Sequence, residues 1–400
     1  MRPRRLLLSL ILASFAVGYI VLVRQVFVPL HESGRAQGVT SVLCGLGHLL
    51  ELPGVLAATG TSMRAKASSG APWVRALAFN GCLYFAIAAL FTGALRRARP
   101  SPAASPPGAD GGAYSRRGFL RAGAALVAAG GGGAFVYGFF VEPRWIRTQQ
   151  RVFPVRGLPR ELDGLRMVQL TDVHLGPWIS LAYVQAAVDI CNSLDPDIVL
   201  LTGDYVHRSP VYFEPVAGAL ARLRARIGRF AVLGNHDWWE GVTPARGCLH
   251  RVGIPTIDNG RVFITPDRRI ETVAAGGLCI AGVGDLWEDV VDFEKALGGV
   301  PSETPRLLLS HNPDVAEERA LIEGGYRVDL MIAGHTHGGQ VRLPFLGTPI
   351  VPSRFGSKYA EGLVAGPVCP VFICRGVGMT VLPVRWGAPP EIALIQLKAS

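Results

Sequence analysis

Aspartate, asparagine and histidine residues follow five apolar segments of the chain, and together they form a set of side chains that divalent cations bind. In chain order, RMVQL precedes Asp172 and His174, DIVLL precedes Asp204, RFAVL precedes Asn235, His236 and Asp237, RLLLS precedes His311, and DLMIA precedes His335 and His337. Mixed oxygen and imidazole ligands are typical of sites for manganese, iron or zinc. The sequence therefore predicts a metal centre.

The five motifs differ in how strongly each indicates a metal site. Asp and Gly end strands for structural reasons, so a single Gly203-Asp204 is weak evidence. His335 and His337 are two residues apart, so they point to the same side only on an extended segment, where one loop can serve two adjacent ions. All five motifs in order, each after an apolar run, are hard to explain as turns alone.

The segments that must position these residues alternate between two types. The five apolar runs are typical of strands that are buried on both faces of a sheet. Helices are predicted over residues 180–194, with Ser180 as the N-cap, and over residues 215–226, with Pro215 at the first position. A last strand is predicted over residues 391–397. This alternation indicates an α/β domain, in which polar residues at the carboxyl ends of strands converge on one edge.

The motifs, spread over about residues 165–340, resemble those of the calcineurin-like metallophosphoesterases. The resemblance implies a two-sheet αββα sandwich with helices outside and two divalent ions (manganese, iron or zinc) at one edge. It assigns Asp172, His174 and His337 to one ion, Asn235, His311 and His335 to the other, and Asp204 to both as a bridge. It also makes His236 the catalytic histidine and Asp237 the residue that orients it.

The chemistry of such a centre is hydrolysis of a phosphodiester or a pyrophosphate. Two ions ~3.5–4 Å apart lower the pKa of a shared water and hold the phosphoryl oxygens. The implied reaction is in-line attack of a metal-bridging hydroxide, without a covalent enzyme intermediate. The imidazole of His236 could donate a proton or a hydrogen bond to the leaving oxygen. A metal-free binding scaffold on the same fold is the alternative, and the complete ligand set argues against it.

The segment Gly334-His335-Thr336-His337-Gly338-Gly339-Gln340 resembles that of a membrane-associated, often exported, bacterial subgroup. Some of its members cleave UDP-2,3-diacylglucosamine and others are phosphodiesterases, so lipid-linked and nucleotide-linked phosphoesters are candidate substrates. Guanidinium groups match the geometry of phosphate oxygens, which makes three arginines candidates for binding a second phosphate. They are Arg342, Arg354 and Arg375.

Several residues near the motifs have two interpretations. His207 is close in sequence to Asp204 and could line the site, or it could be satisfied locally. Asp285 follows an apolar run, where a strand-end turn is the more frequent role. Trp238, Trp239 and Trp287 would by default pack in the core, although tryptophans beside the catalytic histidine could form an apolar wall for a lipid or a base.

The first 150 residues have a different composition, with 16 Lys and Arg against four Asp and Glu. Three uncharged runs, at residues 6–23, 76–95 and 122–141, approach the ~20 residues that cross a bilayer as a helix. We expect a membrane segment of two or three helices over residues 1–99, a flexible linker over 100–114 and a signal anchor helix over 115–141. Arg116 and Arg117 before the last run resemble a twin-arginine export signal, and a plain positive-inside anchor is the alternative.

The remaining charge bears on partners and location. Residues 151–400 hold 24 basic and 26 acidic side chains, so no nucleic-acid partner is expected. The distribution of basic residues places Arg116 and Arg117 in the cytoplasm. It places the catalytic domain, residues 142–400, on the periplasmic or extracytoplasmic side of a bacterial cell membrane. The sequence leaves open the substrate, the metal, the number of membrane spans, cleavage of the anchor and the oligomeric state.

Overall fold

The structure is a computed structural model, and it describes residues 133–134, 136–274, 276–344 and 347–400. Residues Tyr137–Ser400 form one compact unit. The predicted membrane segment, the linker and most of the predicted signal anchor lie outside the described residues. Within the part of the chain that is described, no helix combines the length and the apolar character needed to cross a membrane.

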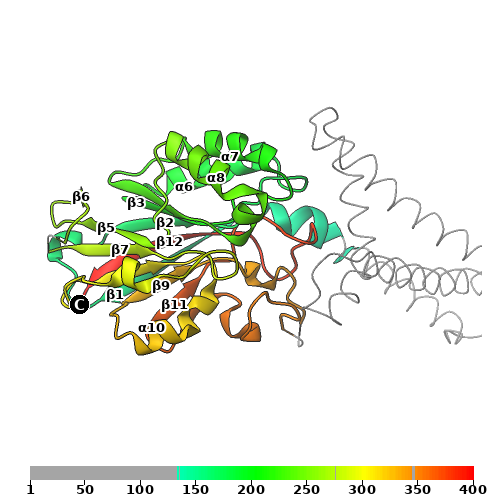
Figure 1. The fold of residues 1–400 in the computed structure, drawn as a ribbon. Coiled ribbons are helices and arrows are strands. Elements are labelled where there is room, and N and C mark those ends of the chain that lie inside the picture. The colour runs from blue at the N-terminus through cyan, green and yellow to red at the C-terminus, as the bar shows by residue number, and fades with distance from the viewer. Residues whose placement is uncertain (1–132, 135, 275, 345–346) are drawn as a thin grey trace, which may run out of the picture. The chain divides into compact units, whose positions relative to one another are not determined.

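Two β-sheets form the centre of this unit (Figure 1). The first sheet contains, in spatial order, β1 (Arg147–Val155), β12 (Glu391–Ala399), β2 (Arg166–Leu170), β3 (Ile198–Thr202) and β4 (Gly228–Val232). The second contains β10 (Gly362–Ala365), β11 (Pro370–Ile373), β9 (Leu330–Ala333), β8 (Arg306–Leu309), β7 (Leu278–Gly282), β5 (Gly260–Ile264) and β6 (Ile270–Glu271). The five predicted strands before the motifs are β2, β3, β4, β8 and β9, which confirms them.

Strand direction brings the motifs to one edge of each sheet. Strands β2, β3 and β4 are parallel, and β7, β8, β9 and β11 are parallel in the other sheet. Their carboxyl ends therefore lie together within each sheet. Strand β12, which contains the predicted strand at residues 391–397, runs antiparallel to β2 and parallel to β1. Strand β1 was not predicted, because most of its side chains are polar and exposed.

The two sheets bury a shared apolar layer between them. Met167 and Leu200 from the first sheet and Leu309 and Ile332 from the second are fully buried in this layer. Successive residues of a strand point to opposite faces, so Val168, next to Met167, belongs to the outer cluster under the helices instead. The inter-sheet layer thus holds the two sets of strand ends in a fixed relation.

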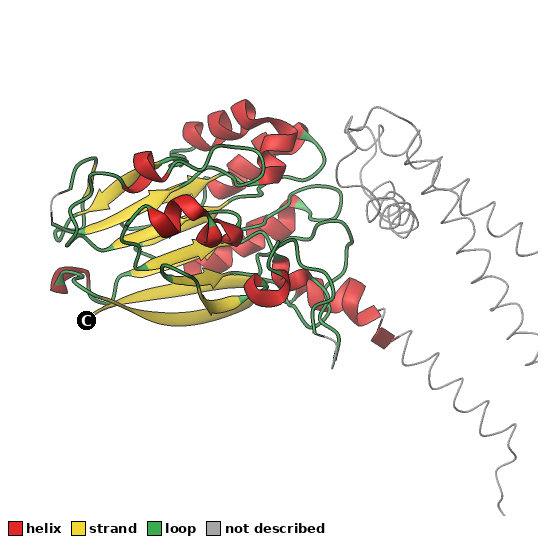
Figure 2. Cartoon of the chain, turned by 60° about the horizontal axis from the view of Figure 1, so that its bottom comes forward, coloured by secondary structure: helices red, strands yellow, loops and turns green. Residues whose placement is uncertain are grey.

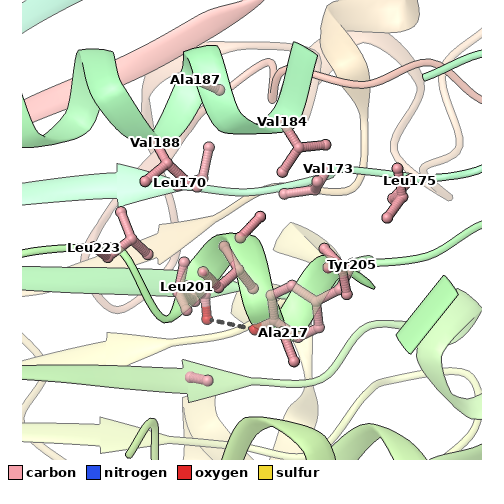
Figure 3. Packing of buried hydrophobic residues seen from close by; sticks show 14 of the residues in the cluster. Leu170, Val173, Leu175, Val184, Ala187, Val188, Leu201, Tyr205, Ala217 and Leu223 are labelled. Carbon is pink, nitrogen blue, oxygen red and sulfur yellow. Dashed lines mark hydrogen bonds between the residues drawn. The ribbon is translucent and has the colours of Figure 1, made fainter. Parts of the chain in front are cut away.

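Helices cover the outer faces of both sheets, which gives the expected four-layer αββα arrangement (Figure 2). The first sheet is covered by α6 (Leu181–Ser193), α7 (Phe213–Leu220) and α8 (Asn235–Arg251), and the second by the shorter α9 (Phe293–Leu297) and α10 (Arg319–Glu323). Figure 3 shows Val188 of α6 beside Leu170 and Val184 of the same helix over Val173. Ser180 caps α6 as predicted, because its hydroxyl accepts the backbone N–H of Tyr183 at 3.3 Å.

Helix α7 differs from its predicted span of residues 215–226. It begins at Phe213 and ends at Leu220. The side chain of Asn192 on α6 explains the early end, since it donates to the carbonyl of Arg222 at 2.9 Å and accepts from the N–H of Arg224 at 2.7 Å. These bonds satisfy backbone groups that a longer helix would have paired internally.

Candidate metal centre

Three of the predicted ligands form a buried group at the ends of β2 and β9. Asp172, His174 and His337 are close enough for one ligand atom of each to reach a single ion. The Nε2 atoms of His174 and His337 lie 3.1 Å apart, and His337 Nε2 lies 3.3 Å from Asp172 Oδ1. All three side chains are almost completely buried. This group is called the first ligand group below.

A second ligand group, Asp204, His311 and His335, comes from the ends of β3, β8 and β9. His311 Nε2 lies 3.2 Å from Asp204 Oδ2 and 3.1 Å from His335 Nδ1. The same Asp204 Oδ2 lies 3.4 Å from His174 Nε2 of the first ligand group. One carboxylate oxygen therefore stands between the two groups, as a bridging ligand must.

One buried polar atom shows that this cluster fits a metal ion. Asn235 Oδ1 has no hydrogen-bond partner in the described part of the chain. A buried polar atom without a partner costs about 1–3 kcal/mol, so native structures rarely retain one without a reason. An amide oxygen is a metal ligand, and an ion would satisfy it.

The backbone of the predicted ligands is strained. Asp172, His174, Asp204, His335 and His337 all have positive φ angles, between 49° and 71°. Non-glycine residues rarely adopt this region, and such strain concentrates at functional sites. Five of the seven predicted metal ligands share it, so the strand-end turns hold these side chains at the expense of local backbone energy.

Glycines beside the ligands allow the loops to approach one another. A Cβ at Gly234 would collide with Asp204 Oδ1, and a Cβ at Gly334 would collide with Asp172 Oδ2. Both glycines precede predicted ligands, Asn235 and His335. A larger residue at either position would push its loop away from the carboxylate of Asp204 or of Asp172.

The protonation of the histidines follows from burial and from Asp204. Burial lowers the pKa of His335 to about 3 and holds the pKa values of His174 and His337 well below their usual range, so these rings are neutral. Burial opposes a charge on His311 too, but the carboxylate of Asp204 raises the pKa of His311 to about 10. Without metal, a proton on His311 thus balances Asp204, and a cation would compete with that proton.

His236, the predicted catalytic histidine, is close to both ligand groups. It begins α8 just after Asn235, its ring centroid lies 4.7 Å from that of His174, and its backbone N–H donates to Asp204 Oδ1 at 2.9 Å. His207, whose role the sequence left open, places its Nδ1 3.2 Å from His236 Nδ1. His207 therefore lines the site and contacts the His236 ring.

Asp237 occupies a different place from the one expected. The sequence interpretation had it orient the His236 imidazole. Its carboxylate instead accepts the backbone N–H groups of Asp204, Tyr205 and Gly234 at 2.8, 2.9 and 3.0 Å. It thereby fastens the loop after β3 to the loop after β4. Asp237 thus holds the backbone that carries Asp204, and Nδ1 of His207 lies 3.2 Å from Nδ1 of the His236 imidazole.

The three candidate phosphate-binding arginines are all engaged with carboxylates. Arg342 and Arg375 both pair with Glu361, and Arg375 Nε also lies 2.7 Å from Glu391 Oε2. Arg354 lies 3.6 Å from Glu318 through its Nη2. Their charges are thus balanced within the protein, and their predicted role in binding phosphate stays a prediction.

Sequence reasoning passed over two arginines near the centre. Arg208 has a φ of 70°, and its Nε donates to His207 Nε2 at 3.0 Å. Its position four residues after Asp204 was the available signal. Arg385 is fully buried and donates to the carbonyls of Arg375, Gly376, Gly378 and Ala388, while its Nη2 lies 3.3 Å from His337 Nδ1. The segment Arg385-Trp386-Gly387 before the last strand also resembles the membrane-associated subgroup, but the sequence assigns Arg385 no role, because its partners come from distant loops.

Comparison with known proteins agrees with this geometry. A family description for "Calcineurin-like phosphoesterase" matches residues 165–339, the stretch that contains every ligand described above. The chain belongs to the calcineurin-like metallophosphoesterase family, and its buried His/Asp groups are typical of a metal site in that family.

Three curated relatives are similar over most of the described domain. The uncharacterized metallophosphoesterase YkuE of Bacillus subtilis (strain 168) is 32% identical over 294 residues, 72% of this chain and 98% of that protein. Phosphodiesterase YaeI of Escherichia coli (strain K12) is 32% identical over 291 residues, 71% of this chain and 99% of that protein. The transmembrane protein with metallophosphoesterase domain of Danio rerio is 31% identical over 275 residues, which are 66% of this chain and 60% of that protein.

Proposed function

We propose that this phosphoesterase hydrolyses phosphodiester or pyrophosphate bonds at a centre of two divalent ions. The observation that carries the proposal is the position of Asp204 Oδ2, within 3.4 Å of His174 Nε2 and 3.2 Å of His311 Nε2. A single carboxylate oxygen shared by two ligand groups suits a dinuclear site better than a mononuclear one. The name of the relative YaeI, a phosphodiesterase, supports the reaction class.

In this proposal, some residues bind the ions and others contact the leaving group of the substrate. The first group (Asp172, His174 and His337) would hold one ion, Asn235, His311 and His335 the other, and Asp204 both. When bound, the two ions supply Lewis-acid activation of a water molecule and neutralise charge on the phosphoryl oxygens. The His236 ring donates a hydrogen bond or a proton to the leaving oxygen, and His207 at 3.2 Å limits how that ring can turn.

The proposal includes a membrane tether. The three uncharged runs before residue 142 would anchor the chain, with Arg116 and Arg117 acting as a twin-arginine signal and the catalytic domain on the extracytoplasmic side. The name of the zebrafish relative, a transmembrane protein, supports an anchor. A tethered domain favours lipid-linked substrates, and UDP-2,3-diacylglucosamine combines a lipid with a nucleotide.

The test is hydrolysis by the purified full-length chain in detergent. Bis-p-nitrophenyl phosphate, p-nitrophenyl phosphate and a UDP-sugar would each be supplied with manganese, with zinc and with chelator. We expect metal-dependent turnover that is highest on the diester or the pyrophosphate and is lost in Asp204→Asn and His236→Ala. Asp189→Asn makes the same chemical change as the first variant on an exposed residue of α6, and should keep full activity.

A metal-free scaffold is the outcome that would contradict the proposal. A folded wild-type chain that binds no ions and hydrolyses none of the three substrates with either metal would establish it. Turnover on p-nitrophenyl phosphate alone would instead indicate a phosphomonoesterase. Tethering has its own test, because carbonate extraction of membranes should leave the chain in the membrane fraction.

A further inference from the structure

Two exposed tryptophans stand beside the candidate metal centre, one from each half of the sandwich. The ring centroid of Trp239 lies 4.6 Å from that of His236, and the ring centroid of Trp287 lies 4.5 Å from that of His335. The two indoles are nearly parallel, with centroids 6.5 Å apart and an interplanar angle of 26°. Each ring therefore contacts a histidine of the candidate site: Trp287 contacts a member of the second ligand group, and Trp239 contacts the predicted catalytic histidine.

Exposure separates these two residues from ordinary core aromatics. Trp239 is 53% exposed and Trp287 is 44% exposed, although tryptophan is usually well buried. The neighbouring Trp238 behaves as the default interpretation expected, since it packs against the helical core cluster with Arg246 over its ring. The chain thus keeps two large apolar rings in water at the one place where a substrate would meet the metal ligands.

Both rings are held in place before any ligand binds. Trp239 lies one helical turn after His236 on α8, and its Nε1 donates to Glu288 Oε1 at 2.7 Å. The turn that carries Trp287 is fixed by buried Asp285, whose Oδ1 accepts the N–H groups of Trp287 and Glu288 at 2.9 and 3.0 Å. Asp285 is thus a turn residue, and the turn presents Trp287 beside His335.

We propose that Trp239 and Trp287 form an aromatic platform that binds a flat ring, a nucleobase or an aryl group, attached to the phosphate being cleaved. The inference rests on the proposed function, because it assigns a substrate class to the same site. Base–aromatic stacking contributes about 1–3 kcal/mol per base, and it tolerates different bases because every base has a flat face.

The exposure of the two rings favours a flat group over an acyl chain. An acyl chain gains binding energy by removal from water on all sides, which requires an enclosed apolar site. Each indole is about half exposed and offers part of a flat face to solvent, and Trp239 Nε1 is already bonded to Glu288. Stacking needs only such a face, held rigidly at low entropic cost.

The test compares AMP with ribose 5-phosphate, which lacks the base, and with octyl phosphate, which carries an alkyl chain instead. With bis-p-nitrophenyl phosphate as reporter and the full-length chain in detergent, inhibition constants would be measured for AMP, for ribose 5-phosphate and for octyl phosphate. We expect AMP to bind about tenfold more tightly than ribose 5-phosphate, and this ratio to fall to about one in Trp239→Ala and Trp287→Ala. The ratio should persist in Trp287→Phe and in Trp145→Ala, a change at another exposed tryptophan that is 51% exposed.

The ratio is measured within one protein sample, so partial misfolding of a variant does not alter it. Equal inhibition by AMP and ribose 5-phosphate in the wild type, or a ratio that survives both alanine variants, would overturn the platform. A larger loss for octyl phosphate than for AMP would also overturn it and would indicate an acyl site. Absence of any metal-dependent turnover would count against the proposed function instead, and quenching of tryptophan fluorescence by AMP would then still test the platform.

Discussion

The inter-sheet core and the strand-end loops of this domain differ in backbone conformation and in the polarity of their buried side chains. In the core, residues such as Leu200 and Ile332 lie in regular strands, are fully buried and pack on apolar neighbours. In the loops that follow the same strands, Asp204 and His335 have positive φ angles, and after β4 the buried Asn235 Oδ1 has no hydrogen-bond partner among the described residues. The core holds the fold together, and the loops keep a ligand set that is unfavourable until metal binds.

The comparison implies that stability and metal chemistry can be changed separately. A change in a loop should alter metal binding and activity without unfolding the protein. A change in the core should lower stability and leave the activity of the folded fraction intact. Each prediction below tests one side of this separation.

The largest expected effect is on activity, from Asp204→Asn. The substitution keeps the shape and the Oδ1 acceptor for the His236 N–H, but removes the charge between the two ligand groups. Diester turnover should fall by about 10²–10³-fold or more, since the bridge and its electrostatic contribution are lost. The melting temperature of the metal-free protein should fall, because the variant loses the buried carboxylate that balances the proton on His311. The variant should still fold, and a metal-free variant that is unfolded at room temperature would break the comparison.

The next largest effect is on stability, from Leu200→Ala in the inter-sheet core. Truncation of a fully buried leucine should lower the free energy of unfolding by about 3 kcal/mol. Urea unfolding followed by tryptophan fluorescence measures it. Leu181→Ala on α6, where the leucine is 38% exposed, is the matched control and should cost far less. Loss of metal from the folded Leu200→Ala protein would show that core and loops are coupled more tightly than we infer.

Metal removal should act on the loops first. With each ion at about 100 times its dissociation constant, chelation should remove about 3 kcal/mol of stability for every ion that is bound. Hydrogen exchange should then accelerate at Gly338 and Gly339, beside His337, while the amides of Leu200 and Ile332 stay protected up to global unfolding. Uniform acceleration across both regions would contradict the separation.

The smallest expected effect is a pH dependence from Asp258, whose Oδ1 accepts the N–H of Leu233 at 2.8 Å, just before the Gly234-Asn235 turn. Burial raises the pKa of Asp258 from an ordinary value of 3.8 to about 6. The folded state thus binds this proton more tightly than the unfolded state, and the associated stability is lost as pH rises from about 4 through 6. Asp258→Asn should remove the loss, so the variant should gain on the order of 1 kcal/mol relative to wild type between pH 4 and pH 7. An unchanged difference over that range would contradict the assignment.

Much of the fold could be predicted because local patterns determine it. The runs at β2, β3, β4, β8 and β9 are apolar on both faces, which is sufficient to identify strands in a covered sheet. The pairing of β1 with β12 could not be predicted, because it joins Arg147 to Glu391 across most of the domain through a largely polar strand. The end of α7 depends on Asn192, a residue of another helix.

In the candidate site too, local patterns predicted some features, and contacts between distant segments determine the others. The predicted ligands were identified by their position after strands. The structure brings the two aspartates and four histidines among them together in two groups, while their roles toward metal stay a prediction. The partners of Asp237, His207 and Arg385 could not be foreseen, because each depends on how loops from different strands approach one another. The motif for Asp237 predicted an aspartate at the site, but its hydrogen bonds to backbone N–H groups exist only in the folded loops.

The most direct test of the central claim is the number of ions bound per chain. Metal content of the purified full-length chain, measured by mass spectrometry after dialysis against manganese or zinc, should be two per chain. It should fall to about one in His337→Ala, which removes a ligand of the first group only, and stay at two in His250→Ala, a histidine outside both groups. A wild-type chain that holds at most one ion under these conditions would contradict the dinuclear centre.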